Sequence, residues 1–414
     1  MNKGILLFLG CLLLVSVSGC GSSSSTTTTT KPNALLFAAN TFSPSVSALT
    51  VTTGALGPAT PFATTGNFPL TLAAVSDKFL YAGLPTSGGV ITTVLGRPAV
   101  PGASGGILLM PIKANAVLDT PQLFASGDYG VIAVTPSGNA LYAADQTNSL
   151  LAAFSIDSTK GTLTAIGPQG PPAGLPVGFD PFSIAIDPLG KYVFVANCNC
   201  ITPHNPPQGA VSVFSIDSST GALAAVGKFP IGGEINAHPV ALAVSPDSKF
   251  LFVASLDDQV YVENIALDTG KLTDAAVAQL PLAGSKPVTI AVSTDGNFLY
   301  TGNTGTQTIS FFLTCTQNPP TITGCGTNSN GNLVHQSDIP VTSPGAFGTL
   351  VADPAGGFLY IPDFDHNTVL VFSIASCSGV TVPCTPGSLS QSSAVNTGGA
   401  KPFGLAIAPI PTSK

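Results

Sequence analysis

The sequence contains no tryptophan, a single arginine, and few charged residues of any kind. Lys, Arg, Asp and Glu together make up 8% of the 414 residues. Exposed helix faces are normally rich in charged side chains, so this scarcity argues against a helical protein. Positive charge is the smaller share, with 13 Lys and Arg against 20 Asp and Glu. Nucleic acid and anionic lipid headgroups are therefore not expected as partners.

Turn-forming residues are abundant, with 45 Gly and 36 Pro. After Cys20 no apolar stripe with a period of 3.6 residues and helix caps is found. Short apolar runs separated by Gly, Pro, Asp and Ser favour strands joined by tight turns. The composition therefore predicts an all-β body with almost no helix.

The N-terminus has the features of an export signal. Residues 1–19 carry one Lys and then an apolar stretch too short to span a membrane as a helix. The sequence Val17-Ser18-Gly19-Cys20 resembles the lipobox of bacterial lipoproteins, in which the Cys is lipidated after cleavage. An ordinary signal cut nearby is the alternative. Residues 20–32, rich in Ser and Thr, then form a flexible linker. These features predict a protein of the bacterial cell envelope, in the periplasm or at the cell surface, that contacts the membrane only through its lipid anchor.

Six cysteines follow Cys20, and an even number in an exported protein favours disulfides. Their spacing suggests two local pairs, Cys315 with Cys325 and Cys377 with Cys384. Cys198 and Cys200 are separated by one residue, so their redox state is left open. A metal site that combines them with His204 is the less favoured alternative.

One type of segment occurs seven times: an apolar run, a turn, and a second apolar run ending in a small polar residue. Examples are VALAVSPDSKFLFVAS from Val240 and FSIAIDPLGKYVFVAN from Phe182. A repeat of about 55 residues accommodates four short strands, as in a propeller blade. The apolar runs are continuous rather than alternating, which is typical of strands covered on both faces. The turns align at Asp77, Pro136, Pro188, Pro246, Thr294, Pro354 and Pro409.

The two ends of the repeat region complement each other. ALLFAAN from Ala34 is a second strand without its first, and KPFGLAIAP from Lys401 is a first strand without its second. Pairing them completes a seventh blade and closes the ring. We therefore predict that residues 33–410 form a seven-bladed β-propeller of four-stranded antiparallel blades, closed by pairing of the C-terminal strand with the N-terminal strand.

With the repeats aligned, the chain resembles the seven-bladed lactonase family, whose named enzyme is 6-phosphogluconolactonase, and the related YVTN-repeat propellers. The likeness is carried by LYIPDFDHNTVLVFSI from Leu359, VFSIDSSTGAL from Val213 and PVALAVSPDSKFLFVAS from Pro239. It implies possible activity on lactone rings at one mouth of the central channel. Members that act on phosphorylated substrates are expected to present Arg and His there, whereas this chain has only Arg97 and four His.

The residue before the first strand of each blade is expected to lie at the channel mouth. Five of these positions are charged or hold a His, and we interpret His238 and Asp180 as a candidate general base and its partner. Asp128, Lys286 and Lys401, with the nearby Glu234, are candidate ligand-binding residues. The alternative is that all of them are solvated loop residues. In chain order the mouth positions are Phe68, Asp128, Asp180, His238, Lys286, Ala346 and Lys401.

Two further motifs are less informative. Residues 102–106 satisfy GxSxG, but the sequence has no strand before Ser104 and no helix after it, so we interpret the match as chance. Asp363, Asp365 and His366 have metal-binding side chains at close spacing. Asp363 takes the position of Asn or Asp that caps the same turn in other repeats, so capping is the preferred interpretation. No metal or other cofactor is expected.

These observations favour a binding scaffold for a small polar ligand or another envelope protein. The alternative is a lactonase that hydrolyses an uncharged or weakly charged lactone through His238. An apolar or blocked channel mouth favours the scaffold, whereas a His held by an Asp beside an open pocket favours the enzyme.

Overall fold

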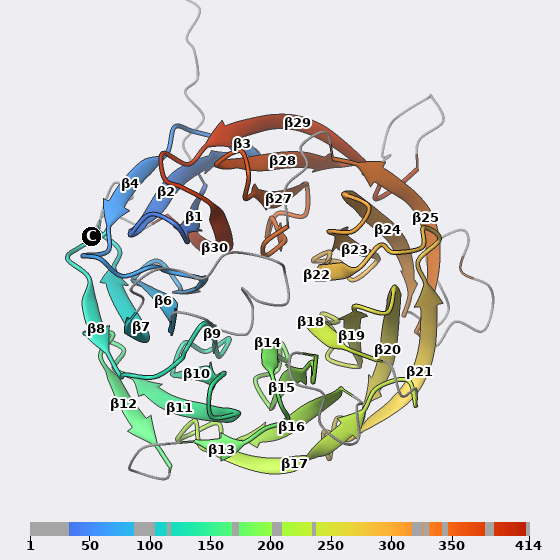
Figure 1. The fold of residues 1–414 in the computed structure, drawn as a ribbon, viewed down its shortest axis with the longest axis horizontal. Helices are drawn as coiled ribbons and strands as arrows, with labels where there is room; N and C mark the ends of the chain where they lie inside the picture. The colour runs from blue at the N-terminus through green and yellow to red at the C-terminus, as the bar shows by residue number, and fades with distance from the viewer. Residues whose placement is uncertain are drawn as a thin grey trace, which may run out of the picture. The chain divides into compact units, whose positions relative to one another are not determined.

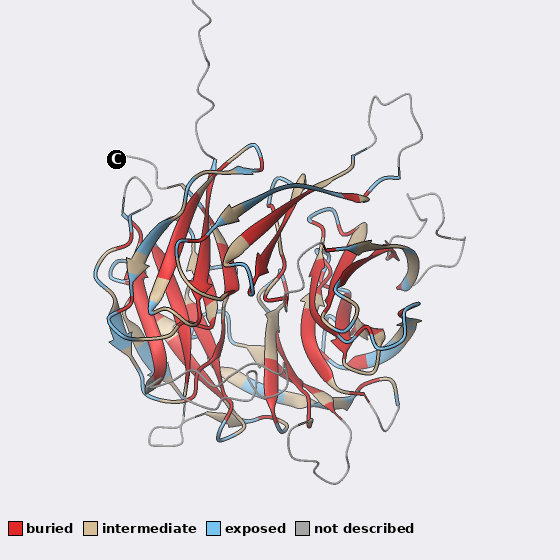
Figure 2. Ribbon diagram, turned by 45° about the horizontal axis from the view of Figure 1, so that its top comes forward, coloured by how far each residue is buried: buried red, intermediate tan, exposed pale blue. Residues whose placement is uncertain are grey.

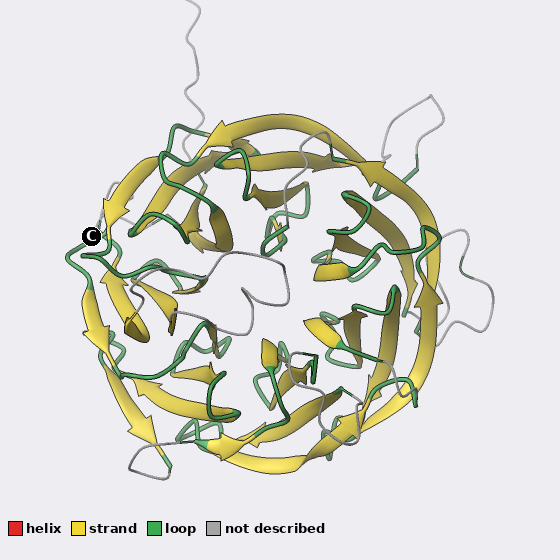
Figure 3. Ribbon diagram, in the orientation of Figure 1, coloured by secondary structure: helices red, strands yellow, loops and turns green. Residues whose placement is uncertain are grey.

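The computed structural model describes residues 33–86, 104–113, 117–167, 174–200, 209–233, 237–316, 325, 331–341, 347–376 and 385–410. All regular elements in these ranges are β-strands (Figure 3). The strands form seven antiparallel sheets around a central axis (Figure 1). This arrangement confirms the predicted all-β seven-bladed propeller.

In each sheet the strands run outward from the axis in chain order, apart from the sheet that contains both ends of the ring. The first sheet contains β5 (Thr71–Val75), β6 (Phe79–Thr86), β7 (Ser104–Pro111) and β8 (Gln122–Phe124). The second contains β9 (Val131–Val134), β10 (Ala140–Asp145), β11 (Leu150–Ile156), β12 (Leu163–Ile166) and β13 (Leu175–Pro176). The third contains β14 (Pro181–Ile186), β15 (Tyr192–Asn197), β16 (Ala210–Ile216) and β17 (Leu223–Pro230). The fourth sheet contains β18 (Pro239–Val244), β19 (Phe250–Ser255), β20 (Gln259–Ile265) and β21 (Leu272–Gln279). The fifth contains β22 (Pro287–Val292), β23 (Phe298–Asn303), β24 (Thr308–Cys315) and β25 (Asn332–Pro340). The sixth contains β26 (Val351–Ala352), β27 (Phe358–Asp363), β28 (Thr368–Ile374) and β29 (Leu389–Asn396).

The closing sheet joins the two ends of the ring. It contains, from the axis outward, β30 (Pro402–Pro409), β1 (Ala34–Asn40) and β2 (Ser45–Thr52), with β3 (Ala55–Leu56) and β4 (Thr60–Ala63) both paired to β2. Strands β1 and β30 are antiparallel, with Leu36 opposite Ile407. The predicted closure by the C-terminal and N-terminal strands is therefore confirmed.

The continuous apolar runs are explained by burial on both faces of each sheet. In β1, Leu35 and Phe37 pack toward the β5–β8 sheet, whereas Leu36 and Ala38 pack toward the β26–β29 sheet. The second strands are buried along their length, as the red inner layers in Figure 2 show. Burial of apolar area between neighbouring sheets is the main force that holds such a ring together.

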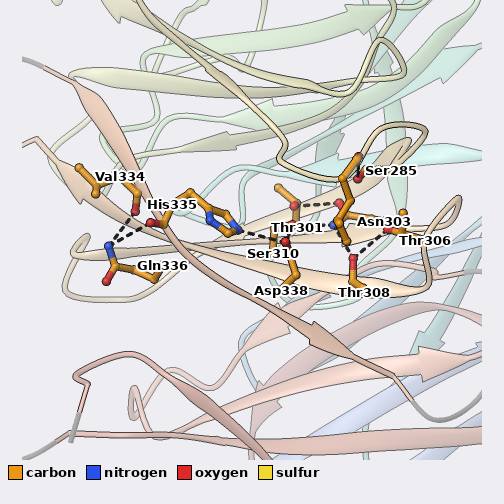
Figure 4. Close-up of polar contacts among 11 residues, drawn as sticks. Ser285, Thr301, Asn303, Thr306, Thr308, Ser310, Val334, His335, Gln336 and Asp338 are labelled. Carbon is orange, nitrogen blue, oxygen red and sulfur yellow. Dashed lines mark hydrogen bonds and ion pairs between the residues drawn. The ribbon is translucent and has the colours of Figure 1, made fainter.

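Every innermost strand begins, and every second strand ends, at the same end of the ring, which we call the mouth face. Pro181 at the start of β14 is thus opposite Asn197 at the end of β15. A polar side chain at the end of the second strand fixes the turn that follows. The Asn197 and Asn303 amides donate to Ser212 Oγ at 2.9 Å and Ser310 Oγ at 2.7 Å; Figure 4 shows the second pair. These caps position the loops of the mouth face.

Candidate functional site

The innermost strands enclose a central cavity of about 180 Å³. Its wall consists of apolar side chains together with a few hydroxyl groups, and no charged residue is among those described. Each sheet contributes to the wall, through residues such as Thr71, Val131, Phe182, Val240, Thr289 and Phe403. A phosphate or carboxylate would find no opposite charge here, so the cavity suits a neutral group.

Two hydroxyl groups in the channel wall form hydrogen bonds that connect neighbouring sheets. Thr71 Oγ1 donates to Gly130 O at 2.7 Å, and Leu350 N donates to Thr289 Oγ1 at 3.0 Å. Both bonds join an innermost strand to the next sheet along the chain. These hydroxyls therefore stabilise the ring.

Asp128, one of the predicted mouth residues, is buried and connects three segments. Its carboxylate accepts hydrogen bonds from Thr86 N at 2.7 Å and Thr147 Oγ1 at 2.9 Å. It is 4% exposed, and burial raises the pKa of this carboxyl above its ordinary value despite those hydrogen bonds. These contacts give Asp128 a structural role at the mouth face.

The two predicted lysines differ in their surroundings. Lys401 Nζ lies 3.0 Å from Asp365 Oδ1 and 5.0 Å from the centre of the Phe364 ring, so its ammonium group contacts both side chains. Lys286 is exposed, and its backbone N–H donates to Asp258 Oδ1 at 2.7 Å. Glu234 lies outside the described residues, as does the mouth position at Ala346.

His238 and Asp180 both contact one short segment, which a disulfide between Cys198 and Cys200 closes. His238 Nδ1 lies 3.0 Å from Cys198 O, and Cys200 N donates to Asp180 Oδ2 at 2.9 Å. Since a carbonyl only accepts, the neutral His238 ring carries its proton on Nδ1. The contact that orients His238 is thus the Cys198 carbonyl, and the structure resolves the open redox state as a disulfide.

A His–Asp pair does occur on the mouth face, at His366 and Asp363. His366 Nδ1 lies 3.0 Å from Asp363 Oδ2. The Asp363 side chain is 3% exposed and the His366 side chain is 51% exposed. Asp363 Oδ1 also accepts the backbone N–H groups of Asp365 and His366 at 3.2 Å, so the predicted capping role is present. A buried carboxylate that holds an exposed imidazole is the arrangement of a general base and its orienting group.

The sequence interpretation does not pair these two residues, because it considers Asp363 as a turn cap or a metal ligand. The sequence feature that could have indicated this pair is the i, i+3 spacing of an acidic residue and a His in a tight turn. A cap at the end of β27 places residue i+3 directly over the carboxylate. Lys401 lies beside the same turn through its contact with Asp365. The turn therefore carries an imidazole, a carboxylate that contacts it and a nearby ammonium group.

A second His–Asp pair lies at the outer strand of another sheet. His335 Nε2 is 3.1 Å from Asp338 Oδ1, which also accepts Ser310 Oγ at 2.5 Å (Figure 4). Ser310 is completely buried, and the His and the Ser both contact the Asp rather than each other. This order cannot activate the Ser as a nucleophile.

The remaining predicted sites are only partly visible. A disulfide joins Cys315 to Cys325, whereas Cys377, Cys384 and Cys20 lie outside the described residues. The GxSxG match at residues 102–106 leads into strand β7 and not into a helix. In the part of the chain that the structure describes, no group of three or more His, Cys, Asp or Glu could hold a metal ion. Within the same residues, no helix has the length and apolar character required to cross a membrane.

Sequence comparison links part of the chain to lactonases. The family model "Lactonase, 7-bladed beta-propeller" matches residues 113–202 and 181–281. A 6-phosphogluconolactonase of Formosa agariphila is 33% identical over 90 residues, which are 22% of this chain and 23% of that protein. A 6-phosphogluconolactonase of Pectobacterium atrosepticum is 35% identical over 101 residues, 24% of this chain and 26% of that protein. The chain thus spans about a quarter of the length of the curated relatives that it matches.

Similarity of fold extends over most of the chain. The periplasmic gluconolactonase PpgL of Pseudomonas aeruginosa superimposes with a TM-score of 0.67, covering 92% of this chain and all of that one at 17% identity. A putative 6-phosphogluconolactonase of Bacteroides fragilis gives a TM-score of 0.64 at 17% identity, covering 92% of this chain and 99% of that one. At this identity the likeness establishes the fold alone. The chain is thus a seven-bladed β-propeller that is similar to the lactonase family over part of its sequence.

Proposed function

We propose that the protein binds and hydrolyses a small, uncharged or weakly charged lactone on the mouth face. The observation that carries this proposal is the His366–Asp363 pair, in which a buried carboxylate orients an exposed imidazole. The partial sequence match to 6-phosphogluconolactonases supports the reaction class. The geometry thus favours the alternative in the sequence interpretation, with His366 in place of His238 as the base.

The chemistry follows from the protonation of the His366 ring. Asp363 accepts the Nδ1 proton, so the lone pair of the neutral ring is on Nε2. In the proposed reaction Nε2 removes a proton from water as the water oxygen attacks the lactone carbonyl carbon. Collapse of the tetrahedral intermediate breaks the ring C–O bond, and His366 returns the proton to the leaving oxygen. The product is a hydroxy acid.

Lys401 has a supporting electrostatic role in this proposal. Its ammonium is held by Asp365, the residue before His366. An ammonium group near the reacting carbonyl would stabilise the oxyanion that develops in the transition state.

The choice of a weakly charged substrate rests on what surrounds the channel. The described residues that line the cavity carry no charge. Binding of a dianionic phosphate usually requires several cationic donors, and Arg97 is the only arginine in the chain. A phosphorylated lactone is therefore expected to be a poorer substrate than a neutral one.

The test is hydrolysis of glucono-δ-lactone and of its 6-phosphate by the full chain, corrected for spontaneous ring opening. We expect turnover of the neutral lactone and a loss of about 100-fold or more in His366→Ala. Asp363→Asn should reduce turnover through misorientation of the ring. The matched control is His335→Ala, since His335 has the same i, i+3 contact with an Asp away from the channel. Absence of turnover, or an equal loss in His335→Ala, would refute the proposed site.

Binding without catalysis is a second candidate function, favoured by the apolar wall of the channel. In that case the mouth face holds a small polar ligand or another envelope protein as a scaffold. Calorimetry with the lactone distinguishes the lactonase from the scaffold. A scaffold binds the lactone or its hydroxy acid and leaves the lactone ring intact.

The proposed location is the cell envelope, with the propeller anchored through lipidated Cys20 and the linker at residues 20–32. Two disulfides in the described residues support an oxidising compartment. The structurally similar gluconolactonase of Pseudomonas aeruginosa is described as periplasmic. Labelling of cells with a radioactive fatty acid should mark the wild type and leave Cys20→Ala unlabelled.

A further inference from the structure

A second cavity, larger than the central channel, lies away from the axis. It has a volume of about 1030 Å³, compared with about 180 Å³ for the central channel. It lies between the β22–β25 and β26–β29 sheets, on the face opposite the mouth, because its walls include the β22–β23 and β26–β27 turns. We call it the lateral cleft. Its size is that of a site for a ligand of several rings.

The walls of the lateral cleft combine aromatic, amide and carboxylate groups. Phe298 is half-buried there, and Asp295, Asn297 and Gln336 supply polar side chains. Asp295 is held in position, since its Oδ2 accepts Asn297 Nδ2 at 2.8 Å. The described residues lining the cleft include no Lys, Arg or His. An anionic ligand therefore finds no charge partner, whereas a ligand with many hydroxyl groups finds both donors and acceptors.

A β-bulge in the outer strand sets the direction of the Gln336 side chain. Strand β25 has a bulge opposite Phe311 and Phe312, and Gln336 is the extra residue. Bulges reorient a side chain at the edge of a sheet. The equivalent bulge residues of three other sheets are Val226, Ala275 and Ser392. An amide is present at this position only beside the lateral cleft, among these four sheets.

Figure 4 shows how Gln336 differs from its neighbour. The His335 ring extends toward Asp338, whereas the Gln336 amide turns back to its own strand and donates to Val334 O at 3.2 Å and His335 O at 3.3 Å. Gln336 is exposed, so a ligand can exchange for these local bonds at small cost. The side chain is thus available to a ligand in the cleft.

We propose that the lateral cleft binds a neutral oligosaccharide. Sugar rings present hydroxyl groups to amides and carboxylates and an apolar C–H face to an aromatic ring, which matches Asp295, Asn297 and Gln336 beside Phe298. This site is separate from the mouth face and does not depend on lactone hydrolysis. It would allow the protein to attach to a glycan of the envelope.

The structure also offers a variant that fills the cleft without straining the fold. Gly357 lines the cleft, its φ is outside the left-handed region, and a Cβ built on it meets no atom within 4 Å. Gly357→Trp should therefore fold and occupy part of the cleft. Gln336→Ala removes the amide from an exposed position.

The experiment measures binding of cellohexaose, maltohexaose and chitohexaose to the full chain by calorimetry. At least one should bind, with a loss of affinity of at least 10-fold in Gly357→Trp and a smaller loss in Gln336→Ala. Gly357→Ala and His366→Ala are the matched controls and should bind as wild type. Failure of all three hexasaccharides to bind, or unchanged binding in Gly357→Trp that melts as wild type, would overturn the proposal. Lactone turnover in Gly357→Trp reports separately on the mouth face.

Discussion

At the scale of single residues, Glu263 is the clearest case of a side chain in conflict with its surroundings. It is 2% exposed on β20 and faces Asp274 on the neighbouring strand β21. Burial, and then the charge of Asp274, raise the pKa of Glu263 to about 8. The carboxyl group is therefore protonated in the folded protein near neutral pH, whereas it is ionised when the chain unfolds.

This shift makes the stability of the fold dependent on pH. The folded state binds the proton more tightly, so the contribution of Glu263 is complete below its unfolded pKa and is lost as pH rises through about 8. Between these limits the free energy of unfolding should fall by at most about 1.4 kcal/mol for each pH unit. Glu263→Gln should remove this dependence, as measured by urea unfolding at pH 5 and pH 8. Equal slopes in wild type and variant would contradict the assignment.

The sequence could predict the positions of the candidate site residues along the strands but not their side-chain contacts. The repeat correctly placed Asp180 and His238 at equivalent positions before innermost strands. Their contacts depend on the positive φ of Asp180 and on the disulfide at Cys198, which no repeat pattern specifies. The His366–Asp363 contact depends on a single turn, and it was visible only once the cap and the imidazole could be placed together.

At the scale of elements, neighbouring sheets are joined by a recurring contact. A Tyr on the second strand of one sheet donates its hydroxyl to a backbone carbonyl in the turn of the next sheet. Tyr81, Tyr142 and Tyr300 bond to Gly161, Gly221 and Gly387 at 2.6, 2.9 and 2.7 Å. Burial raises the pKa of these tyrosines, so they remain neutral donors. The Tyr of FLY or ALY on the second strand, together with a Gly turn in the next repeat, thus joins neighbouring blades.

Glycine is required in those turns for two reasons. Gly387 has a φ of +82°, and a Cβ on it would lie 2.4 Å from the Phe298 ring. Gly387→Ala should therefore lower the free energy of unfolding by at least about 2 kcal/mol, from backbone strain and overpacking together. Gly357→Ala is the matched control in the same sheet, since its Cβ meets open space. Denaturant unfolding of the two variants should separate them clearly, and equal stabilities would contradict this account.

One element departs from the sequence prediction. The innermost strand expected from Gly348 is reduced to β26, which has two residues. The backbone approaches Phe403 closely here, because a Cβ on Gly348 would lie 2.0 Å from Phe403 O. The short strand belongs to one of the two sheets that border the lateral cleft. Apolar periodicity predicts that a strand exists, but not how far its ladder extends when a neighbouring sheet crowds it.

At the scale of the whole molecule, the ring is specified by repetition and by its two incomplete ends. Seven apolar clusters each lie between two neighbouring sheets, so every sheet depends on both neighbours. An eighth cluster, which includes Phe182, Val240 and Phe403, surrounds the axis at the mouth face. The sequence could predict this architecture because the burial pattern and the caps recur in each unit. It could not predict the lateral cleft, because the repeat does not specify how the turns of two neighbouring sheets lie relative to each other.

The pairing of β30 with β1 closes the ring and thereby places all mouth residues around one axis. Leu36 lies opposite Ile407, whereas Ala406 points to the other face of the sheet. The decisive measurement is disulfide cross-linking of the full chain carrying Leu36→Cys with Ile407→Cys, read by peptide mass mapping, with Leu36→Cys and Ala406→Cys as the offset control. We predict a cross-link in the first pair and little in the second. No cross-link in the first pair, or equal cross-linking in both, would contradict a ring closed in this register.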